Sequence, residues 1–173
     1  MKHFSLLIFI ALVFVISACK EQINDGDEIK YEWVKIGEFS GEEERQEIAK
    51  ITREWMSDIG YCCEGREMPF KVMSVTDNHF TGTRVQYDSM YAQANGTFKI
   101  NGYFEWSTAD GSWTGHFWGD LTIGTGVTVD YKGMGQGAYD GLYFEMHSIH
   151  PGDPTTPTGT GTFSGELFQK QRI

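Results

Sequence analysis

Thr114-Gly115-His116-Phe117-Trp118-Gly119-Asp120-Leu121 recurs as Thr160-Gly161-Thr162-Phe163-Ser164-Gly165-Glu166-Leu167, and this repeat is a strong indication of the fold. Each copy has the order Gly-x-Phe-x-Gly. Side chains two residues apart on a strand face the same way, so each phenylalanine shares a face with two glycines. A bulky ring between glycines is typical of a strand that bends sharply around a small barrel.

A second pair of similar stretches lies upstream of these copies. Tyr103-Phe104-Glu105-Trp106 is matched by Tyr143-Phe144-Glu145-Met146 at an offset of 40 residues, whereas the first pair is offset by 46 residues. The additional residues fall in the segment 150–158, which holds three of the four prolines. The simplest interpretation is two similar β-hairpins, the second with a longer proline-rich loop.

Strand-like segments fill most of the chain, separated by turn signals such as Asp77-Asn78 and Asp110-Gly111. Eight or nine strands at such short spacing indicate an antiparallel sandwich or a closed barrel. Closure leaves no exposed sheet edge. We therefore expect one mainly β domain over residues 29–173, an antiparallel eight-stranded barrel. The candidate strands are 29–39, 68–76, 79–87, 91–100, 102–108, 112–123, 127–133, 138–149 and 158–170.

One segment predicts a helix. Ser40-Gly41-Glu42-Glu43 has the form of a capping box, and its glutamates favour the positive start of a helix. Gly60 follows as a stop signal. We expect one amphipathic helix over about residues 41–58, packed on the β domain. Its apolar face, with spacings of three and four, would carry Ile48, Ile51, Trp55 and Ile59.

The first residues resemble a bacterial lipoprotein signal. Lys2 supplies a positive start, residues 4–16 are apolar apart from Ser5, and Ile16-Ser17-Ala18-Cys19 resembles a lipobox. The resemblance implies cleavage of a signal peptide of residues 1–18 and acylation of Cys19. Several acyl chains hold a protein firmly on a membrane. Residues 19–28 would then form a lipidated acidic tether.

Charge and the tether indicate where the protein acts. The net charge of −10 disfavours nucleic acid, whose binding depends on neutralising phosphates. It also disfavours anionic head groups, so the contact with the bacterial membrane is expected through Cys19. Lys20, and not aspartate, follows that cysteine, which resembles sorting to the outer membrane. We expect a lipid-anchored protein of the bacterial cell envelope, facing the periplasm or the cell surface.

A longer resemblance covers roughly residues 113–167. Gly133-Met134-Gly135-Gln136-Gly137-Ala138-Tyr139-Asp140-Gly141-Leu142, followed by Gly159-Thr160-Gly161-Thr162-Phe163-Ser164-Gly165, resembles the glycine-rich strand pair of the allene oxide cyclase-like barrel proteins, which include the dirigent-type proteins. The resemblance implies an eight-stranded antiparallel barrel with a cavity. It does not imply cyclase chemistry, because no catalytic residue of the plant enzymes matches a position here. Calycin-type barrels, lipocalin-like or avidin-like, fit the same residues.

Three residues are candidates for chemistry: Glu105, Glu145 and His147. If their faces point inward, they place an acid–base or metal-capable group in the cavity. The opposite faces are more apolar, so we expect these three side chains to be solvated. The core candidates of those opposite faces are Phe104, Trp106, Leu142, Phe144 and Met146.

Other motifs predict no metal or cofactor. The glycine run 133–137 lacks the helix that a phosphate loop requires. His147 and His150 would point to opposite faces of a strand. Cys62 and Cys63 are expected to be partly buried, unreactive thiols beside a turn, with a strained disulfide between these neighbours as the less common alternative.

Three functions are open from the sequence. We expect non-catalytic binding of a small apolar ligand or of an envelope protein partner. An isomerase- or cyclase-type enzyme that uses a cavity carboxylate or histidine is the second hypothesis. A purely structural interaction subunit is the third.

Overall fold

The computed structural model describes residues 29–58, 60–152 and 158–173. The predicted signal peptide, Cys19 and the tether lie outside the described residues. Glu32–Gln171 form one compact unit, and in the other the Ile173 amide donates to the Lys30 carbonyl over 3.0 Å. Within the described part, no helix is long and apolar enough to cross a membrane.

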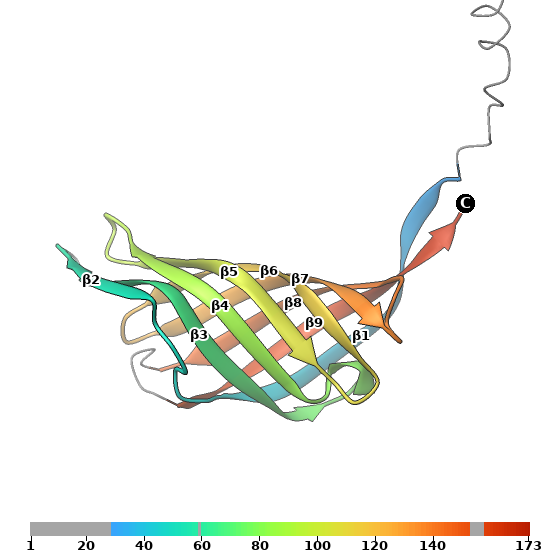
Figure 1. Cartoon of the computed structure of the whole chain (residues 1–173), viewed down its shortest axis with the longest axis horizontal. Coiled ribbons are helices and arrows are strands. Elements are labelled where there is room, and N and C mark those ends of the chain that lie inside the picture. Colours follow the sequence, from blue (N-terminus) through green and yellow to red (C-terminus); the bar gives the residue numbers. More distant parts are fainter. Residues whose placement is uncertain (1–28, 59, 153–157) are drawn as a thin grey trace, which may run out of the picture. The chain divides into compact units, whose positions relative to one another are not determined.

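The predicted β class is confirmed, because the described residues form one antiparallel sheet of nine strands (Figure 1). The strands are β1 (Tyr31–Arg45), β2 (Arg53–Ser57), β3 (Gly60–Val75), β4 (Thr83–Ala92), β5 (Phe98–Ser107), β6 (Gly111–Thr122), β7 (Gly126–Gly137), β8 (Leu142–Pro151) and β9 (Gly159–Arg172).

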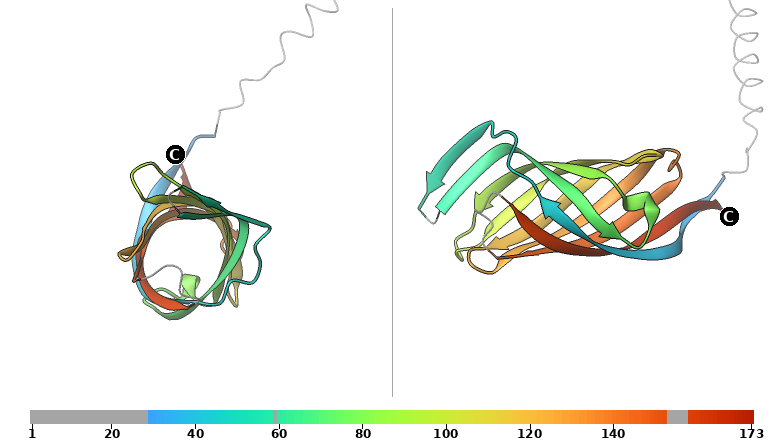
Figure 2. Two further views of the ribbon diagram at one scale, coloured as in Figure 1. Left: turned by 90° about the vertical axis from the view of Figure 1, so that its left-hand side faces the viewer. Right: turned by 90° about the horizontal axis from the view of Figure 1, so that it is seen from below.

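The sheet closes into a ring. Its strands pair in the order β1-β9-β8-β7-β6-β5-β4-β3-β2, and an additional pairing joins β1 to β3. In that closing pair Gly41 lies opposite Val75 and Arg45 lies opposite Phe70. Figure 2 shows the closed ring seen along its axis. The ring itself therefore contains eight strands, and β2 extends the sheet beyond it by pairing with β3.

The predicted helix over residues 41–58 is wrong. Residues 41–45 complete β1, residues 53–57 form β2, and the described chain contains no α-helix. Ser40 is not a helix cap but pairs with Thr76. Its amide donates to the Thr76 hydroxyl over 3.0 Å, and its carbonyl accepts from the Thr76 amide over 2.9 Å. Pairing with a distant strand thus overrides the local helical signal.

The row of side chains that β1 turns inward explains why the strand is hard to recognise. Phe39, Glu43 and Arg45 are buried, and two of these three are charged. An apolar alternation is the usual sign of a half-buried strand. Here the inward row offers charges, whose partners lie on other strands, so the pattern is absent from the sequence.

Aromatic side chains close one end of the ring. The 3-10 helix η1 (Asn78–Phe80) carries the fully buried Phe80 ring into this end. That ring stacks on Phe39, with centroids 3.7 Å apart, and on Trp113, with centroids 5.1 Å apart. The indole N–H groups of Trp106 and Trp113 donate to carbonyls in or beside η1. Each buried indole therefore has a hydrogen-bond partner, and the pair fixes the turn.

Glycines let the aromatic rings approach the strands. A Cβ on Gly133 would lie 2.4 Å from the Phe144 ring and 2.9 Å from the Phe104 ring. Such contacts are too short for any side chain, so the glycine is required by close packing. The predicted faces of the two hairpins are also confirmed, since Phe104, Trp106, Phe144 and Met146 are buried while Leu142 is half-buried.

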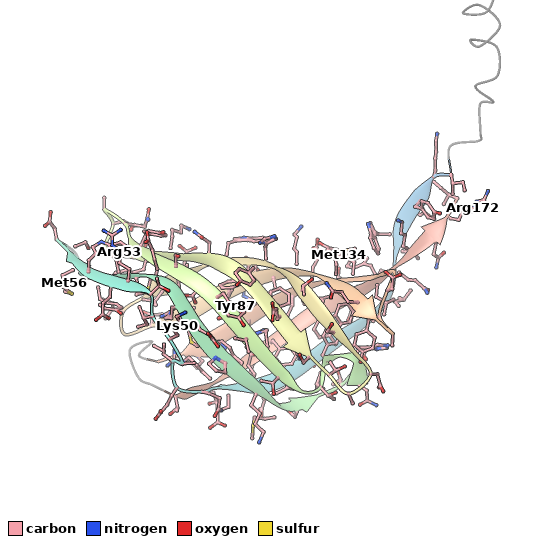
Figure 3. All side chains as sticks on the ribbon, viewed as in Figure 1. Lys50, Arg53, Met56, Tyr87, Met134 and Arg172 are labelled. Carbon is pink, nitrogen blue, oxygen red and sulfur yellow. The ribbon has the colours of Figure 1, made fainter. Side chains whose placement is uncertain are left out.

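The opposite faces of these strands lie outside the ring. Met134 on β7 is exposed and points away from the sheet (Figure 3). Cys62 and Cys63 are buried and free, as expected, and both lie in β3 beside its turn from β2. Burial raises the pKa of the Cys63 thiol, in keeping with an unreactive side chain.

Candidate functional site

A second part of the ring interior, beyond the aromatic rings around η1, is charged. Buried charges are rare unless they are paired, so their presence in a ring that could be filled with apolar residues calls for an explanation. The buried polar and charged side chains of the described residues are Glu43, Arg45, Arg66, Arg84, Gln86, Asp88, Ser148 and His150.

Glu43 is the centre of the first cluster. Its Oε1 accepts from Arg84 Nη2 over 2.7 Å and from Ser148 Oγ over 2.9 Å, and it lies 2.9 Å from His150 Nε2. Burial opposes ionisation of this carboxyl, but Arg84, His150 and Ser148 together hold its pKa at about 2. Glu43 is therefore ionised at neutral pH, with donors from β4 and β8 converging on one oxygen.

Arg84 is held by rings as well as by its carboxylate. Its guanidinium carbon lies 4.3 Å from the Tyr131 ring centroid, 4.7 Å from that of Phe70 and 5.4 Å from that of Trp106. The nitrogens Nε and Nη1 have no hydrogen-bond partner within the described chain. Aromatic faces attract a desolvated cation, so these three rings stand in for the missing acceptors.

The tautomer of His150 follows from its partner. An ionised carboxylate only accepts, so His150 Nε2 must carry the hydrogen that it shares with Glu43. In the neutral imidazole Nδ1 is then an acceptor. Nδ1 is buried and has no hydrogen-bond partner among the described residues. The ring is fixed from the side by Gly161, where an added Cβ would lie 2.4 Å from Nδ1.

A second ion pair lies beside the first cluster. Arg66 donates to Asp88 through Nε over 2.8 Å and through Nη2 over 2.9 Å. Burial raises the pKa of the Asp88 carboxyl above its ordinary value, and the attraction of Arg66 counters part of that rise. Next to this pair, Gln86 Nε2 donates to the Tyr131 hydroxyl. The two-oxygen geometry fixes the Arg66 guanidinium in one plane.

Two adjoining spaces lie at this charged region. An interior cavity of about 20 Å³ is lined by Arg66, Gln86, Tyr131 and His150 among others. A larger pocket of about 320 Å³ lies beside β2, since its lining residue Tyr61 pairs with Met56 of that strand. We call it the mouth pocket. Its apolar lining comes from Ile48, Tyr61, Met90, Phe98, Leu121 and Ile123.

The mouth pocket and the interior cavity share two lining residues. Arg66 and Leu121 line both spaces, so the cavity adjoins the pocket. Ligand sites typically combine an apolar lining with a few convergent polar groups, and volumes of 300 Å³ and above are usual. The mouth pocket, with Arg66 at its inner side, has that character.

The charged cluster lacks the geometry of a nucleophile with its base. In a serine–histidine–acid triad the serine hydroxyl bonds to the histidine, which bonds to the acid. Here Ser148 and His150 both bond to the same oxygen of Glu43. No group of three or more His, Cys, Asp or Glu side chains within the described ranges is placed to hold a metal ion. The arrangement fits recognition of a polar group better than covalent chemistry.

The three candidates from the sequence are not part of this interior. Glu105 is exposed, and Glu145 accepts from Tyr143 Oη over 2.6 Å and from Lys132 Nζ over 2.8 Å. His147 is exposed, with Nδ1 2.7 Å from Asp130 Oδ1. Lys132 and Tyr143 lower the pKa of Glu145. All three lie on the outer face of the ring.

Sequence analysis missed the interior charges for identifiable reasons. Glu43 was interpreted as a helix cap, and nothing local marks Arg84, which lies 41 residues away, as its partner. His150 was placed on the face opposite His147, which the structure confirms. The one available signal was the alternating polar row Arg84, Gln86 and Asp88, which becomes meaningful only when closure turns that face inward.

Comparisons with known proteins give no match: no protein-family model, no curated protein and no solved structure is similar to this chain.

Proposed function

We propose that this protein is a small-molecule binding protein of the bacterial cell envelope, with the mouth pocket as its site. The observation that carries the proposal is the apolar pocket of about 320 Å³ that adjoins a polar cavity. At roughly 30 Å³ for a water-sized group, the pocket holds about ten non-hydrogen atoms. A small, largely apolar molecule fits this space.

Binding is a better account of the interior than catalysis. Arg84, Ser148 and His150 all contact one Glu43 oxygen, so these four side chains are joined in one network. Such a network fixes side chains in place, which suits recognition. An isomerase- or cyclase-type reaction would need an acid or base that transfers a proton during turnover, whereas Glu43 is held ionised by its partners.

The remaining parts of the proposal rest on sequence. We propose that the ring of strands is a barrel of the allene oxide cyclase-like or calycin type, with its closed end at η1. The lipobox-like Ile16-Ser17-Ala18-Cys19 supports a lipid anchor on the bacterial envelope, with the outer membrane favoured by Lys20. In that arrangement the acidic segment 20–28 is the tether between membrane and ring.

Titration of the purified protein with decanol, a neutral ten-carbon probe, tests the binding function. We expect saturable binding of one molecule per chain, with NMR shift changes at the amides of Met90, Phe98 and Leu121. The double variant Ile48→Asp/Ile123→Asp places charges in the pocket lining and should weaken binding by about tenfold or more.

The matched control is Ile36→Asp, since Ile36 is an equally exposed isoleucine of β1 that does not line the pocket. It should bind decanol within about twofold of the parent protein. Absence of saturable binding, or equal binding by the double variant and the parent, contradicts the proposed function.

The anchor is tested separately by expression of the full chain in a Gram-negative host. We expect the protein in the outer-membrane fraction, with mass spectrometry of the processed N-terminus giving an acylated Cys19. Cys19→Ser should release it from the membrane, whereas Cys62→Ser, a change at a buried thiol, should not. Membrane association that survives Cys19→Ser would refute the lipid anchor.

A further inference from the structure

We infer that the ligand is an amphiphile with a single carboxyl head group, bound with one carboxyl oxygen in the interior cavity beside His150, the other oxygen beside Arg66 at the boundary of the two spaces, and the apolar tail in the mouth pocket. This inference rests on the proposed function and names its ligand class. Its basis is the juxtaposition of Arg66, the buried His150 Nδ1 and the adjoining apolar pocket.

Arg66 is placed to receive an acidic oxygen. Two of its nitrogens, Nε and Nη2, donate to Asp88, and Nη1 makes no hydrogen bond with the described part of the chain. The same side chain lines both the mouth pocket and the adjoining cavity. A guanidinium oriented by one carboxylate presents its remaining donors in a fixed direction. A ligand that enters past the apolar lining therefore meets a fixed donor where the apolar surface ends.

His150 supplies the complementary group. It lines the cavity, and its Nδ1 is a buried acceptor without a partner among the described residues. An unpartnered buried polar atom is costly, so a ligand that satisfies it gains affinity. A carboxyl group has two oxygens, one to accept from Arg66 and one to share a proton with Nδ1. The hydrogen bond is the same whether that proton rests on the oxygen or on the imidazole.

The size of the cavity limits the head group. About 20 Å³ accommodates one water-sized group, since about 10–15 Å³ is the least that holds a water. A carboxyl oxygen fits, whereas a phosphate, sulfate or sugar is too large. The mouth pocket takes a tail of about ten non-hydrogen atoms at roughly 30 Å³ each.

Each of the two buried carboxylates has a cationic partner, and Glu43 Oε2 is their one oxygen without a hydrogen-bond partner among the described residues. Glu43 is neutralised by Arg84 at 2.7 Å, and Asp88 by the two-point contact with Arg66. The acidic outer surface of the chain, with its net charge of −10, slows the approach of an anion. Selectivity for the carboxyl group must therefore come from the interior contacts.

A ligand series on the unmodified protein tests this inference. Decanoate, decanol, methyl decanoate and decylammonium share a ten-carbon chain and differ in the head group. Isothermal titration at neutral pH should show decanoate binding about tenfold or more tighter than the other three. Methyl decanoate keeps the carbonyl but has no acidic oxygen, so its weaker binding would assign the preference to the carboxyl group.

The outcomes separate the inference from the proposed function. If decanol, methyl decanoate or decylammonium binds within twofold of decanoate, the carboxyl preference is refuted while a small-molecule site remains. If none of the four binds saturably, both proposals fail. No variant is needed for this comparison, so its result does not depend on the folding of a mutant.

A pair of histidine variants on β8 locates the head group. His150→Gln keeps a donor for Glu43 and removes the acceptor Nδ1, so it should abolish the preference for decanoate over decanol. His147→Gln changes an exposed histidine of the same strand and should leave the preference within twofold. An unchanged preference in folded His150→Gln would overturn the placement of the carboxyl beside His150.

Discussion

The two halves of the ring interior are built from different chemistry. Around η1 the space is filled by aromatic rings, among them the stack of Phe39, Phe80 and Trp113. Beyond these rings the interior holds the Glu43–Arg84 and Arg66–Asp88 pairs. The first half stabilises by burial of apolar area, whereas the second must offset the desolvation of its charges. In the proposal above, the first half maintains the fold and the second carries the ligand site.

The largest effect is expected from Phe80→Ala in the aromatic half. This change removes a fully buried ring that contacts Phe39, Trp106, Trp113 and Phe144, and the turn that carries it cannot collapse into the space. We expect a loss of about 4 kcal/mol in the free energy of unfolding, measured by urea denaturation.

The control for that prediction is Trp118→Ala, which removes a larger ring from the outer face of β6, where Trp118 is 45% exposed. Its cost should be about 1 kcal/mol or less. Similar losses in the two variants would mean that the ring interior does not act as the core.

In the charged half, Arg84→Met should cost about 3 kcal/mol in unfolding free energy, because it leaves Glu43 buried without its counter-ion. The double variant Glu43→Gln/Arg84→Met removes the unpaired charge and should recover at least half of this loss. Urea denaturation of the single and double variants measures both values. A double variant less stable than the single one would contradict the view that desolvation dominates this half.

Stability against acid should distinguish Glu43 from an ordinary carboxylate. Its pKa falls from 4.5 in the unfolded chain to about 2 in the fold. A lowered folded-state pKa contributes stability that is fully present above pH 4.5 and is lost as the pH falls toward 2. The contribution is on the order of 3 kcal/mol. Glu43→Gln lacks this contribution. The difference in unfolding free energy between the parent and this variant, measured by urea denaturation at each pH, should therefore decrease as the pH falls from 4.5 toward 2.

The pKa of Asp88 shifts in the opposite direction, so the acid stability of the parent protein alone would mix two effects. Burial raises the pKa of Asp88, so its contribution is present below pH 3.8 and is lost as the pH rises through the folded-state value. Asp88 is common to the parent and to Glu43→Gln, and its effect cancels in the difference between them. A gap that stays constant from pH 5 to pH 3 would contradict the assignment of acid sensitivity to Glu43.

The same comparison explains what the sequence could predict. The aromatic half can be recognised from the alternation of apolar and polar residues along its strands. The expected burial of Phe104, Trp106, Phe144 and Met146 is confirmed. The charged half has no such pattern, because Glu43, Arg84 and His150 look like solvated residues until ring closure turns them inward. The wrong prediction of a helix over residues 41–58 has the same origin. Glu43 points into the ring from β1, but in the sequence it stands among other glutamates after Ser40, which is the pattern of a capped helix start.

The smallest effect, and the one that links both halves to function, is expected from Gly161→Ala on β9. The added Cβ would lie 2.4 Å from His150 Nδ1 and Cε1, so the imidazole must turn away. We expect a loss of about 1–2 kcal/mol in unfolding free energy from overpacking. Gly159→Ala is the matched control two residues earlier, because its Cβ would meet only an Arg45 nitrogen at 3.6 Å, an ordinary contact.

If His150 holds a carboxyl group, Gly161→Ala should reduce the preference for decanoate over decanol, whereas Gly159→Ala should keep it. Loss of stability in Gly161→Ala with the preference intact would mean that His150 belongs to the packing of the ring and not to the site.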